Sequence, residues 1–292
     1  MTWRRNLLLA AGIALLTTRS ATGQSVRIQV VDVGQGDGIL IRTPNARWVL
    51  IDAGPTRWLA DSLGPLFGVT RFDLVVVSHR HRDHFATIER ILRSFPVDRF
   101  VGNLADCLNR TMDDGIRDAL ADRHIAAQSL GADTLLVDGV RFIILPPDPT
   151  DDRCPDDEND NSVLVRVEYG SFSMLFTGDA EAEERDWLVA NHAALLNVDV
   201  LKAAHHGSSN GTSVGWLAAV TPRAVVISAG VDAHHKHPMA GAVNDYRAET
   251  SGRLHCTNRH GTIRVRGYQD GHFTIGRQRS TTKACTYDGT HY

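Results

Sequence analysis

No apolar run in the 292-residue sequence is long enough to cross a bilayer. A membrane-spanning helix needs about 20 consecutive apolar residues, whereas the apolar run at residues 7–16 has only about ten. The sequence also lacks a strong net charge, with a formal value of -3. The total charge therefore gives no field that attracts nucleic acid, although a local basic surface is compatible with a near-neutral total.

Cysteine is scarce, and its spacing argues against a zinc site made of thiolates. The four cysteines are Cys107, Cys154, Cys256 and Cys285, and none belongs to a Cys-x-x-Cys pair. Four cysteines in an exported chain favour two structural disulfides, for which three connectivities are open. On sequence proximity alone we predict the pairs Cys107–Cys154 and Cys256–Cys285.

The N-terminal segment has the pattern of a secretory signal peptide. Arg4 and Arg5 precede the apolar run at residues 7–16, and small residues follow up to Gly23. This order predicts a signal peptide over residues 1–23 with cleavage near Gln24, and the alternative is an uncleaved anchor. We therefore expect export to the periplasm or the medium, with no membrane association after cleavage.

The remaining chain alternates strand-like and helix-like patterns without an internal repeat. This mixture predicts an α/β or α+β layered fold with helices outside mixed sheets. We expect one domain over residues 24–276 and a C-terminal tail over residues 277–292, where apolar periodicity ends. The predicted strands cover residues 26–33, 38–42, 48–51, 74–77, 140–145, 163–167, 172–176, 198–203, 224–228, 262–265 and 273–275, and the main predicted helices cover residues 85–94, 112–121, 181–191 and 240–250.

The sharpest chemical signal directly follows the predicted strand at residues 74–77. His79, His81, Asp83 and His84 fall within six consecutive positions. Imidazole and carboxylate are ligands for Zn²⁺, Mn²⁺ and iron, and α/β proteins place ligands at strand ends. The pattern predicts a metal site, and the alternative is a basic loop with incidental histidines.

Three further segments carry residues that can complete such a site. Asp179 follows the predicted strand at 172–176, where one carboxylate could bridge two cations about 3.5–4 Å apart. Taken alone, a Thr-Gly-Asp sequence before a helix is more typical of a turn or cap. The neighbouring His205 and His206 also follow a predicted strand, and His237 before Pro238 could bind or protonate a leaving group.

In combination, these motifs resemble the metallo-β-lactamase superfamily, whose signature is His-x-His-x-Asp-His. The similarity covers about residues 26–276 and is greatest to the branch typified by the C-terminal hydrolase domain of the ComEC/Rec2 DNA-uptake channel. It implies an αββα sandwich with a two-metal cleft along one edge of the sheets. The ordered motifs are Asp32-Val33-Gly34-Gln35-Gly36-Asp37, Leu50-Ile51-Asp52-Ala53-Gly54, the segment 79–84, Asn159-Asp160-Asn161-Ser162-Val163-Leu164, Thr177-Gly178-Asp179, residues 201–208 and His237-Pro238.

The resemblance also implies ligands for two divalent ions, Zn or Mn. His206 is favoured over His205 as a ligand because Gly207 follows it, as glycine typically follows the superfamily's last ligand. The usual third histidine on the first ion is missing, and Asn159 or Asp160 stands in that region, which implies a weaker or more oxygen-rich site. The implied ligands are His79 and His81 for the first ion, Asp83, His84 and His206 for the second, and Asp179 between them.

The implied chemistry is hydrolysis by a metal-activated water. Asp83 would orient this water and take up its proton. His237, with Lys202 or Ser208, would stabilise charge on the leaving side, and His205 would support the site. Asp37 and Asp52 are expected to orient ligands or to turn the backbone.

The expected substrates of this secreted, stand-alone hydrolase domain are phosphoesters or phosphodiesters, either small molecules or nucleic acid. We expect no stable nucleic-acid complex. The alternatives are a lactamase or lactonase acting on a carbonyl group, and a binding module without catalysis.

Overall fold

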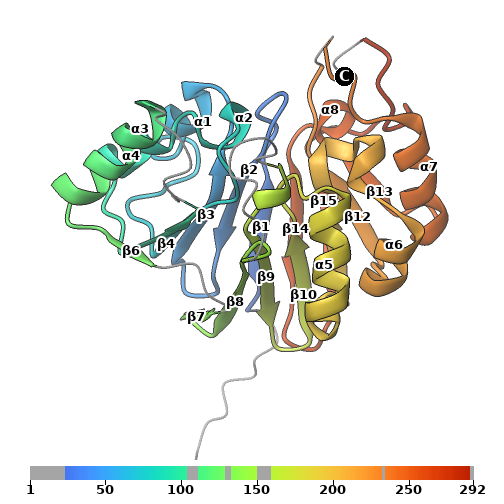
Figure 1. Ribbon diagram of the computed structural model, residues 1–292, viewed down its shortest axis with the longest axis horizontal. Coiled ribbons are helices and arrows are strands. Elements are labelled where there is room, and N and C mark those ends of the chain that lie inside the picture. The colour runs from blue at the N-terminus through green and yellow to red at the C-terminus, as the bar shows by residue number, and fades with distance from the viewer. Residues whose placement is uncertain (1–23, 104–110, 129–132, 150–158, 232–233, 290–292) are drawn as a thin grey trace, which may run out of the picture.

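A computed structural model describes residues 24–103, 111–128, 133–149, 159–231 and 234–289. Within these ranges, two β-sheets face each other, and helices pack on the outer side of each sheet, covering only part of the first (Figure 1). The layers form the αββα sandwich that the sequence predicted. The expected signal peptide at residues 1–23 and the expected Cys107–Cys154 pair lie outside the described residues.

The first sheet has eight strands in the described ranges, in the order β15-β14-β1-β2-β3-β4-β5-β6. Strands β1 to β3 form antiparallel hairpins, and β3 to β6 are parallel to one another. The strands are β1 Val26–Val30, β2 Gly38–Arg42, β3 Trp48–Ala53, β4 Leu74–Val77, β5 Arg99–Gly102, β6 Ala126–Gln128, β14 Ile263–Gly267 and β15 Phe273–Arg277.

The second sheet has seven strands in the described ranges, in the order β13-β12-β11-β10-β9-β8-β7. Strands β7 to β10 are antiparallel, and β10 to β13 are parallel. The strands are β7 Asp133–Val137, β8 Val140–Leu145, β9 Leu164–Tyr169, β10 Phe172–Phe176, β11 Val200–Lys202, β12 Ala224–Ile227 and β13 Leu254–Cys256.

Helices from the two halves of the chain cover opposite sides of the sandwich. Apolar side chains of α1, α3 and α4 pack against the first sheet, and those of α5, α6 and α7 pack against the second (Figure 1). No helix in the described ranges is both long and apolar enough to span a bilayer. The helices are α1 Arg57–Ser62, α2 Arg82–Phe85, α3 Ile88–Ser94, α4 Thr111–Asp122, α5 Ala182–His192, α6 Val214–Val220, α7 Ala240–Glu249 and α8 Thr257–His260.

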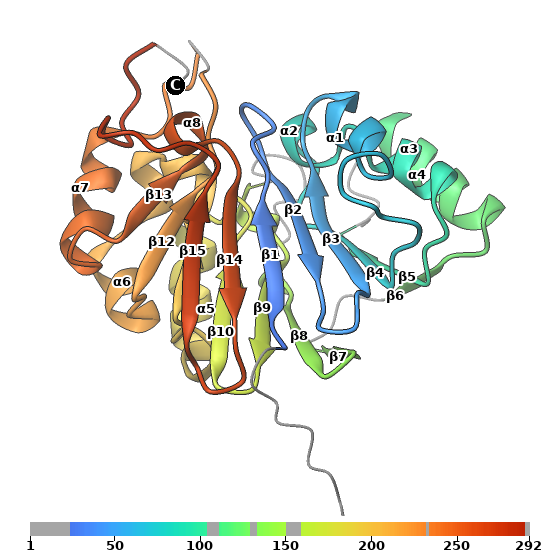
Figure 2. The same cartoon turned by 180° about the vertical axis from the view of Figure 1, so that it is seen from behind.

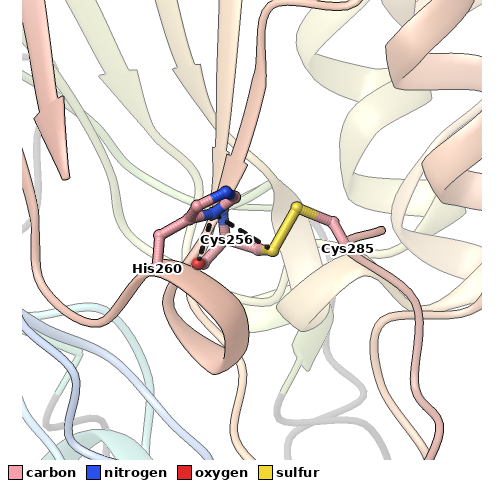
Figure 3. Close-up of side chains that lie close together, drawn as sticks. All are labelled: Cys256, His260 and Cys285. Atoms are coloured by element: carbon pink, nitrogen blue, oxygen red, sulfur yellow. Dashed lines mark hydrogen bonds between the residues drawn. A yellow bond between two sulfur atoms is a disulfide. The ribbon is translucent and has the colours of Figure 1, made fainter. Parts of the chain in front are cut away.

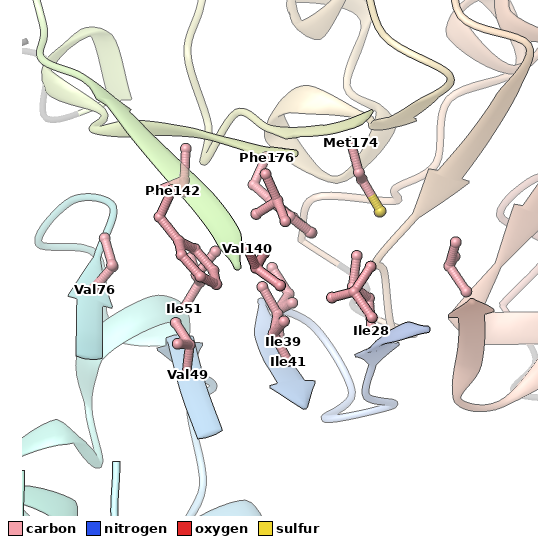
Figure 4. Close-up of a cluster of buried hydrophobic side chains, with 14 of the residues drawn as sticks. Ile28, Ile39, Ile41, Val49, Ile51, Val76, Val140, Phe142, Met174 and Phe176 are labelled. Atoms are coloured by element: carbon pink, nitrogen blue, oxygen red, sulfur yellow. The ribbon is translucent and has the colours of Figure 1, made fainter. Parts of the chain in front are cut away.

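The main core lies between the sheets and follows from the two-residue period of the strands. Ile28 of β1 faces this core together with Phe142 of β8 and Phe176 of β10 (Figure 4). All three side chains are almost fully buried. Burial of each such side chain contributes about 1.5–3 kcal/mol, so the inner faces hold the two sheets together.

One disulfide, Cys256–Cys285, attaches the C-terminal segment to the domain, as the sequence predicted (Figure 3). It joins the end of β13 to a segment that follows β15, across a sequence separation of 29 residues. The backbone N–H of Cys256 donates to Nδ1 of His260, 3.1 Å away. Closing a loop of this length stabilises a folded domain by about 2–4 kcal/mol.

Candidate metal centre

The predicted ligands lie at the ends of central strands from both sheets. β4 leads into the loop that carries His79, and β10 leads into the loop that carries Asp179. β11 leads into the short 3₁₀ helix η3, Ala204–Gly207, which contains His206. Because the two sheets face each other, these loops meet along one edge of the sandwich.

The centre of this edge is a buried cluster made of Asp37, His84, Asp179 and His206. One ligand atom from each residue lies within 4.8 Å of the others. Nε2 of His206 is 3.1 Å from Oδ2 of Asp179 and 3.2 Å from Nε2 of His84. Two imidazole nitrogens and a carboxylate oxygen this close together match the donor set of a divalent metal ion.

Hydrogen bonds on the far side of each imidazole fix which nitrogen faces the cluster. Nδ1 of His206 donates to the carbonyl oxygen of Ser228 at 2.9 Å, and Nδ1 of His84 lies 2.8 Å from Oδ2 of Asp52. This arrangement is typical of metal-binding histidines, because it leaves the Nε2 lone pair for the ion. Two such lone pairs at 3.2 Å would repel each other unless a proton or a cation lay between them, so these residues fit a metal.

His79 and His81 form the neighbouring half of the centre. Nε2 of His79 lies 3.1 Å from Nδ1 of His81 and 4.0 Å from Oδ2 of Asp179. Oδ2 of Asp179 is also 3.3 Å from Nε2 of His84. This carboxylate therefore lies between the two histidine pairs, where a bridging ligand would be placed.

Asp83 lies at the mouth of the cluster, with its side chain 30% exposed and Oδ2 3.2 Å from Nε2 of His206. Its backbone oxygen accepts a hydrogen bond from the N–H of Asp37 at 3.1 Å. A Cβ on Gly36 would lie 2.2 Å from that same oxygen, and Gly36 has a φ of +123°. Glycine is therefore required for the β1–β2 loop to bring Asp37 against the metal-binding loop.

His205 and His206 are consecutive residues that form a left-handed turn, and their side chains point in different directions. Both residues have positive φ values, 47° and 53°, which is unfavourable for non-glycine residues. The turn buries His206 in the cluster and directs His205 to Glu181, whose Oε1 is 3.0 Å from Nδ1 of His205. The structure thus brings His206 together with His84 and Asp179 and leaves His205 beside the cluster.

The cluster concentrates negative charge in a buried volume. Burial on its own lowers the pKa of His206, but the charges of Asp179 and Asp37 together with hydrogen bonds to Asp179 and Asp83 raise this pKa to about 10. Burial also opposes protonation of His84, yet the charges of Asp179 and Asp52 raise its pKa well above the ordinary value. Metal ions would compensate the same negative charge. The carboxylates are Asp37, Asp52, Asp83 and Asp179.

Lys202 supplies a fixed positive charge beneath the cluster. Its side chain is fully buried, its ammonium group forms an ion pair with Asp37, and it donates to the carbonyl oxygen of Gly178 at 2.9 Å. This placement corrects the expectation that Lys202 stabilises charge on the leaving side. Asp37, expected to orient ligands or turn the backbone, has a carboxylate oxygen within 4.8 Å of the ligand atoms of His84, Asp179 and His206.

The remaining predicted residues lie around the cluster. The ring of His237 is buried and stacked 6.2 Å from that of His206. Burial and the charge of His206 lower the pKa of His237 to about 4. Asp160 accepts a hydrogen bond from the backbone of Glu181 at 2.8 Å, and Asn159 donates to the Glu181 carboxylate. Both residues thus bind the segment that begins α5.

The fold and this site together define a metallo-hydrolase. A family model described as "Beta-lactamase superfamily domain" matches residues 47–228, and the chain belongs to this metallo-β-lactamase superfamily. The chain is 28% identical over 259 residues to ComE operon protein 3 of Bacillus subtilis (strain 168), with 82% of this chain and 33% of that protein covered. It is 29% identical over 245 residues to Competence protein ComA of Neisseria gonorrhoeae, with 83% and 32% covered. The chain thus spans about a third of the length of these relatives.

Solved structures share the fold at low sequence identity. The metallo-beta-lactamase fold protein YhfI from Bacillus subtilis has a TM-score of 0.55 and 14% identity, with 86% of this chain and 100% of that chain covered. CmlA, a diiron β-hydroxylase from Streptomyces venezuelae, has a TM-score of 0.54 and 15% identity, with 84% and 55% covered. The similarity to the competence relatives confirms the predicted branch, and these structures confirm the predicted fold.

Proposed function

We propose that the protein is an exported metal-dependent phosphodiesterase that uses two divalent ions, Zn²⁺ or Mn²⁺. The proposed ligands are His79 and His81 for one ion, Asp83, His84 and His206 for the other, and Asp179 between them. Paired ions suit in-line displacement at phosphorus, because they stabilise both the attacking and the leaving oxygen.

We choose a phosphoester as the substrate class because basic side chains surround the metal centre. Arg80 and Arg82 flank His81, and Lys236 directly precedes His237. Arg82 and Lys236 are exposed, and Arg80 is half-buried. Cationic side chains beside a metal centre attract anionic substrates and stabilise the additional charge of a phosphoryl transition state. The relatives named for competence, and a further one named Recombination protein 2, are compatible with a nucleic-acid phosphodiester.

The proposed roles follow from position. Bound divalent ions would supply a nucleophile at neutral pH and polarise the phosphoryl oxygen. Asp83, at the mouth of the cluster, would orient the attacking water and accept its proton. His237, whose buried ring stacks on His206, would face the leaving group, and His205, paired with Glu181, would support this side of the site.

Activity on a simple phosphodiester tests the proposal. We expect purified protein to hydrolyse bis-p-nitrophenyl phosphate in the presence of Mn²⁺ or Zn²⁺, and to lose this activity with EDTA or in an Asp83→Ala variant. Nitrocefin and a γ-lactone serve as carbonyl substrates, and they should remain intact. Turnover of either one without phosphodiester hydrolysis would contradict the assignment, as would stoichiometric metal with no turnover of any substrate.

Export is proposed from two independent features. The N-terminal residues have the pattern of a signal peptide, and the structure contains the disulfide Cys256–Cys285, a bond that persists mainly in oxidising compartments. We expect the intact mass of the protein secreted by its producing cell to correspond to a chain that begins near Gln24. Recovery of the full-length chain from the cytoplasm would contradict export.

A further inference from the structure

A basic groove lies on the outer side of the first sheet, away from the buried metal cluster. Its volume is about 760 Å³, and it is lined by residues of β1, β2, β14 and the segment around α1. Figure 2 shows the outer faces of β14, β1 and β2 with no helix in front of them. A solvated face is ordinary for an antiparallel sheet, so it is the charge of this surface, not its exposure, that needs an explanation.

Strand pairing places three arginines side by side across this face. Arg27 of β1 pairs with Arg266 of β14 on one side and with Arg42 of β2 on the other. Residues directly opposite in antiparallel strands have Cβ atoms about 4.5–5.5 Å apart, and like charges in such pairs destabilise a sheet. Arg264 of β14 adds a fourth guanidinium to the same groove.

No carboxylate in the described ranges forms an ion pair with Arg27, Arg42 or Arg266. Among the described residues that line the groove, Asp32 is the single acid. Folding alone therefore gains no ion-pair energy from this row. An anionic ligand that spans several arginines would compensate their repulsion.

Aromatic side chains accompany the arginines. Trp48 is the cross-strand partner of Arg42, and the guanidinium carbon of Arg42 lies 5.6 Å from the centre of the indole ring. Trp58 of α1 also lines the groove and is 47% exposed. Trp48 is buried beneath Arg42, so Trp58 is the tryptophan of the pair that is open to a ligand. A basic groove with an exposed aromatic ring suits single-stranded nucleic acid, because cations contact phosphates and the ring stacks on an unpaired base.

The groove ends at the loop that supplies a member of the metal cluster. Asp32 and Gly34 line the groove, and Asp37 of the same β1–β2 loop lies in the cluster. A nucleic-acid strand that crossed the arginine row and then followed β1 to Asp32 would thus approach the loop that carries Asp37, next to the centre where a phosphodiester is proposed to be cut.

We propose that this groove binds single-stranded nucleic acid and guides it to the metal centre. The proposal names a substrate class for the phosphodiesterase proposed above and to that extent rests on it, but binding is measurable without turnover. From the sequence we expected no stable nucleic-acid complex, because the net charge of the chain is near neutral. The groove is locally basic, so we now expect a complex that weakens as the salt concentration rises.

Fluorescence anisotropy of a labelled oligothymidylate of about 12 nucleotides, in EDTA, tests the proposal. We expect the double variant Arg27→Gln, Arg266→Gln to weaken binding at least tenfold. It should also reduce the slope of the logarithm of the binding constant against the logarithm of the salt concentration by about 1.4, because it removes two phosphate contacts and each contributes about 0.7 on a single strand. Trp58→Ala should weaken binding at least about fivefold. The matched control is Arg123→Gln with Arg247→Gln, which removes two exposed arginines elsewhere.

Several results would overturn the proposal. They are unchanged affinity in the groove variant, an equal loss in the control variant, or tighter binding to phosphatidylserine vesicles than to the oligonucleotide. If the unsubstituted protein forms a dimer and the groove substitutions abolish it, the groove would instead be the contact surface for a second copy of the chain. The melting temperature of the groove variant should not fall, since repulsion between arginines is removed, and this excludes misfolding as the cause. Failure to hydrolyse phosphodiesters together with intact binding would overturn only the proposed catalytic function.

Discussion

Replacing Asp179 with asparagine is expected to empty the metal centre and to abolish hydrolysis. Oδ2 of Asp179 lies 3.1 Å from Nε2 of His206, 3.3 Å from Nε2 of His84 and 4.0 Å from Nε2 of His79. Asparagine keeps the shape of this side chain but removes its charge. Removing one partner of a buried charge pair costs about 3–5 kcal/mol. We therefore expect metal affinity to fall by about two to four orders of magnitude.

Elemental analysis of purified protein gives the number of ions bound per chain, and bis-p-nitrophenyl phosphate gives the activity. The matched control is Asp186→Asn, which removes the same charge from an exposed position of α5. This control should retain both metal and activity. Full metal content in the Asp179→Asn variant would show that another group bridges the ions and would refute the proposed ligand set.

We expect Lys202→Met to be strongly destabilising, by about 3–5 kcal/mol in the metal-free protein. Methionine fills a similar volume but leaves the buried Asp37 carboxylate without its ion-pair partner. The carbonyl oxygen of Gly178 loses its hydrogen bond from the ammonium group as well. Urea unfolding in EDTA measures this loss as a lower free energy of unfolding.

A double variant separates the charge effect from packing. Lys202→Met combined with Asp37→Asn should recover a large part of the lost stability, because no buried charge is then unpaired. The control Lys283→Met, at an exposed lysine, should change stability by less than about 1 kcal/mol. If the double variant is as unstable as the sum of the two single variants, the ion pair is not the cause.

Much of the strand framework is readable from local apolar patterns. The predicted bounds 38–42, 74–77, 140–145 and 172–176 coincide with β2, β4, β8 and β10. A short, continuous apolar run suffices for strands that are buried on both faces. Strands β5, β6, β7 and β13 were not predicted, because each is short and contains at most three apolar residues.

The predicted helix at residues 85–94 is wrong in one respect, since two helices occupy this region. α2 covers Arg82–Phe85 and α3 covers Ile88–Ser94. The hydroxyl of Thr87, between them, donates to the carbonyl oxygen of Ala53 at 3.1 Å. Because this partner belongs to a distant strand, the break has no signal in the local sequence.

The sequence by itself determined the chemistry of the metal centre. His79, His81, Asp83 and His84 are neighbours in the chain, and Asp179 follows an apolar run that was predicted to be a strand. Ligand type and strand-end position are local properties, so the pattern was sufficient to predict a metal-dependent hydrolase and its superfamily.

Only the tertiary structure decided which distant charges meet. Asp37 joins the cluster because Gly36 allows the β1–β2 loop to contact Asp83. The buried side chain of Lys202 then forms an ion pair with the Asp37 carboxylate. The arginine row exists because β14 returns to pair with β1, which places Arg266 beside Arg27. Sheet register sets these contacts, and a periodicity that spans a few residues carries no information about which strands become partners.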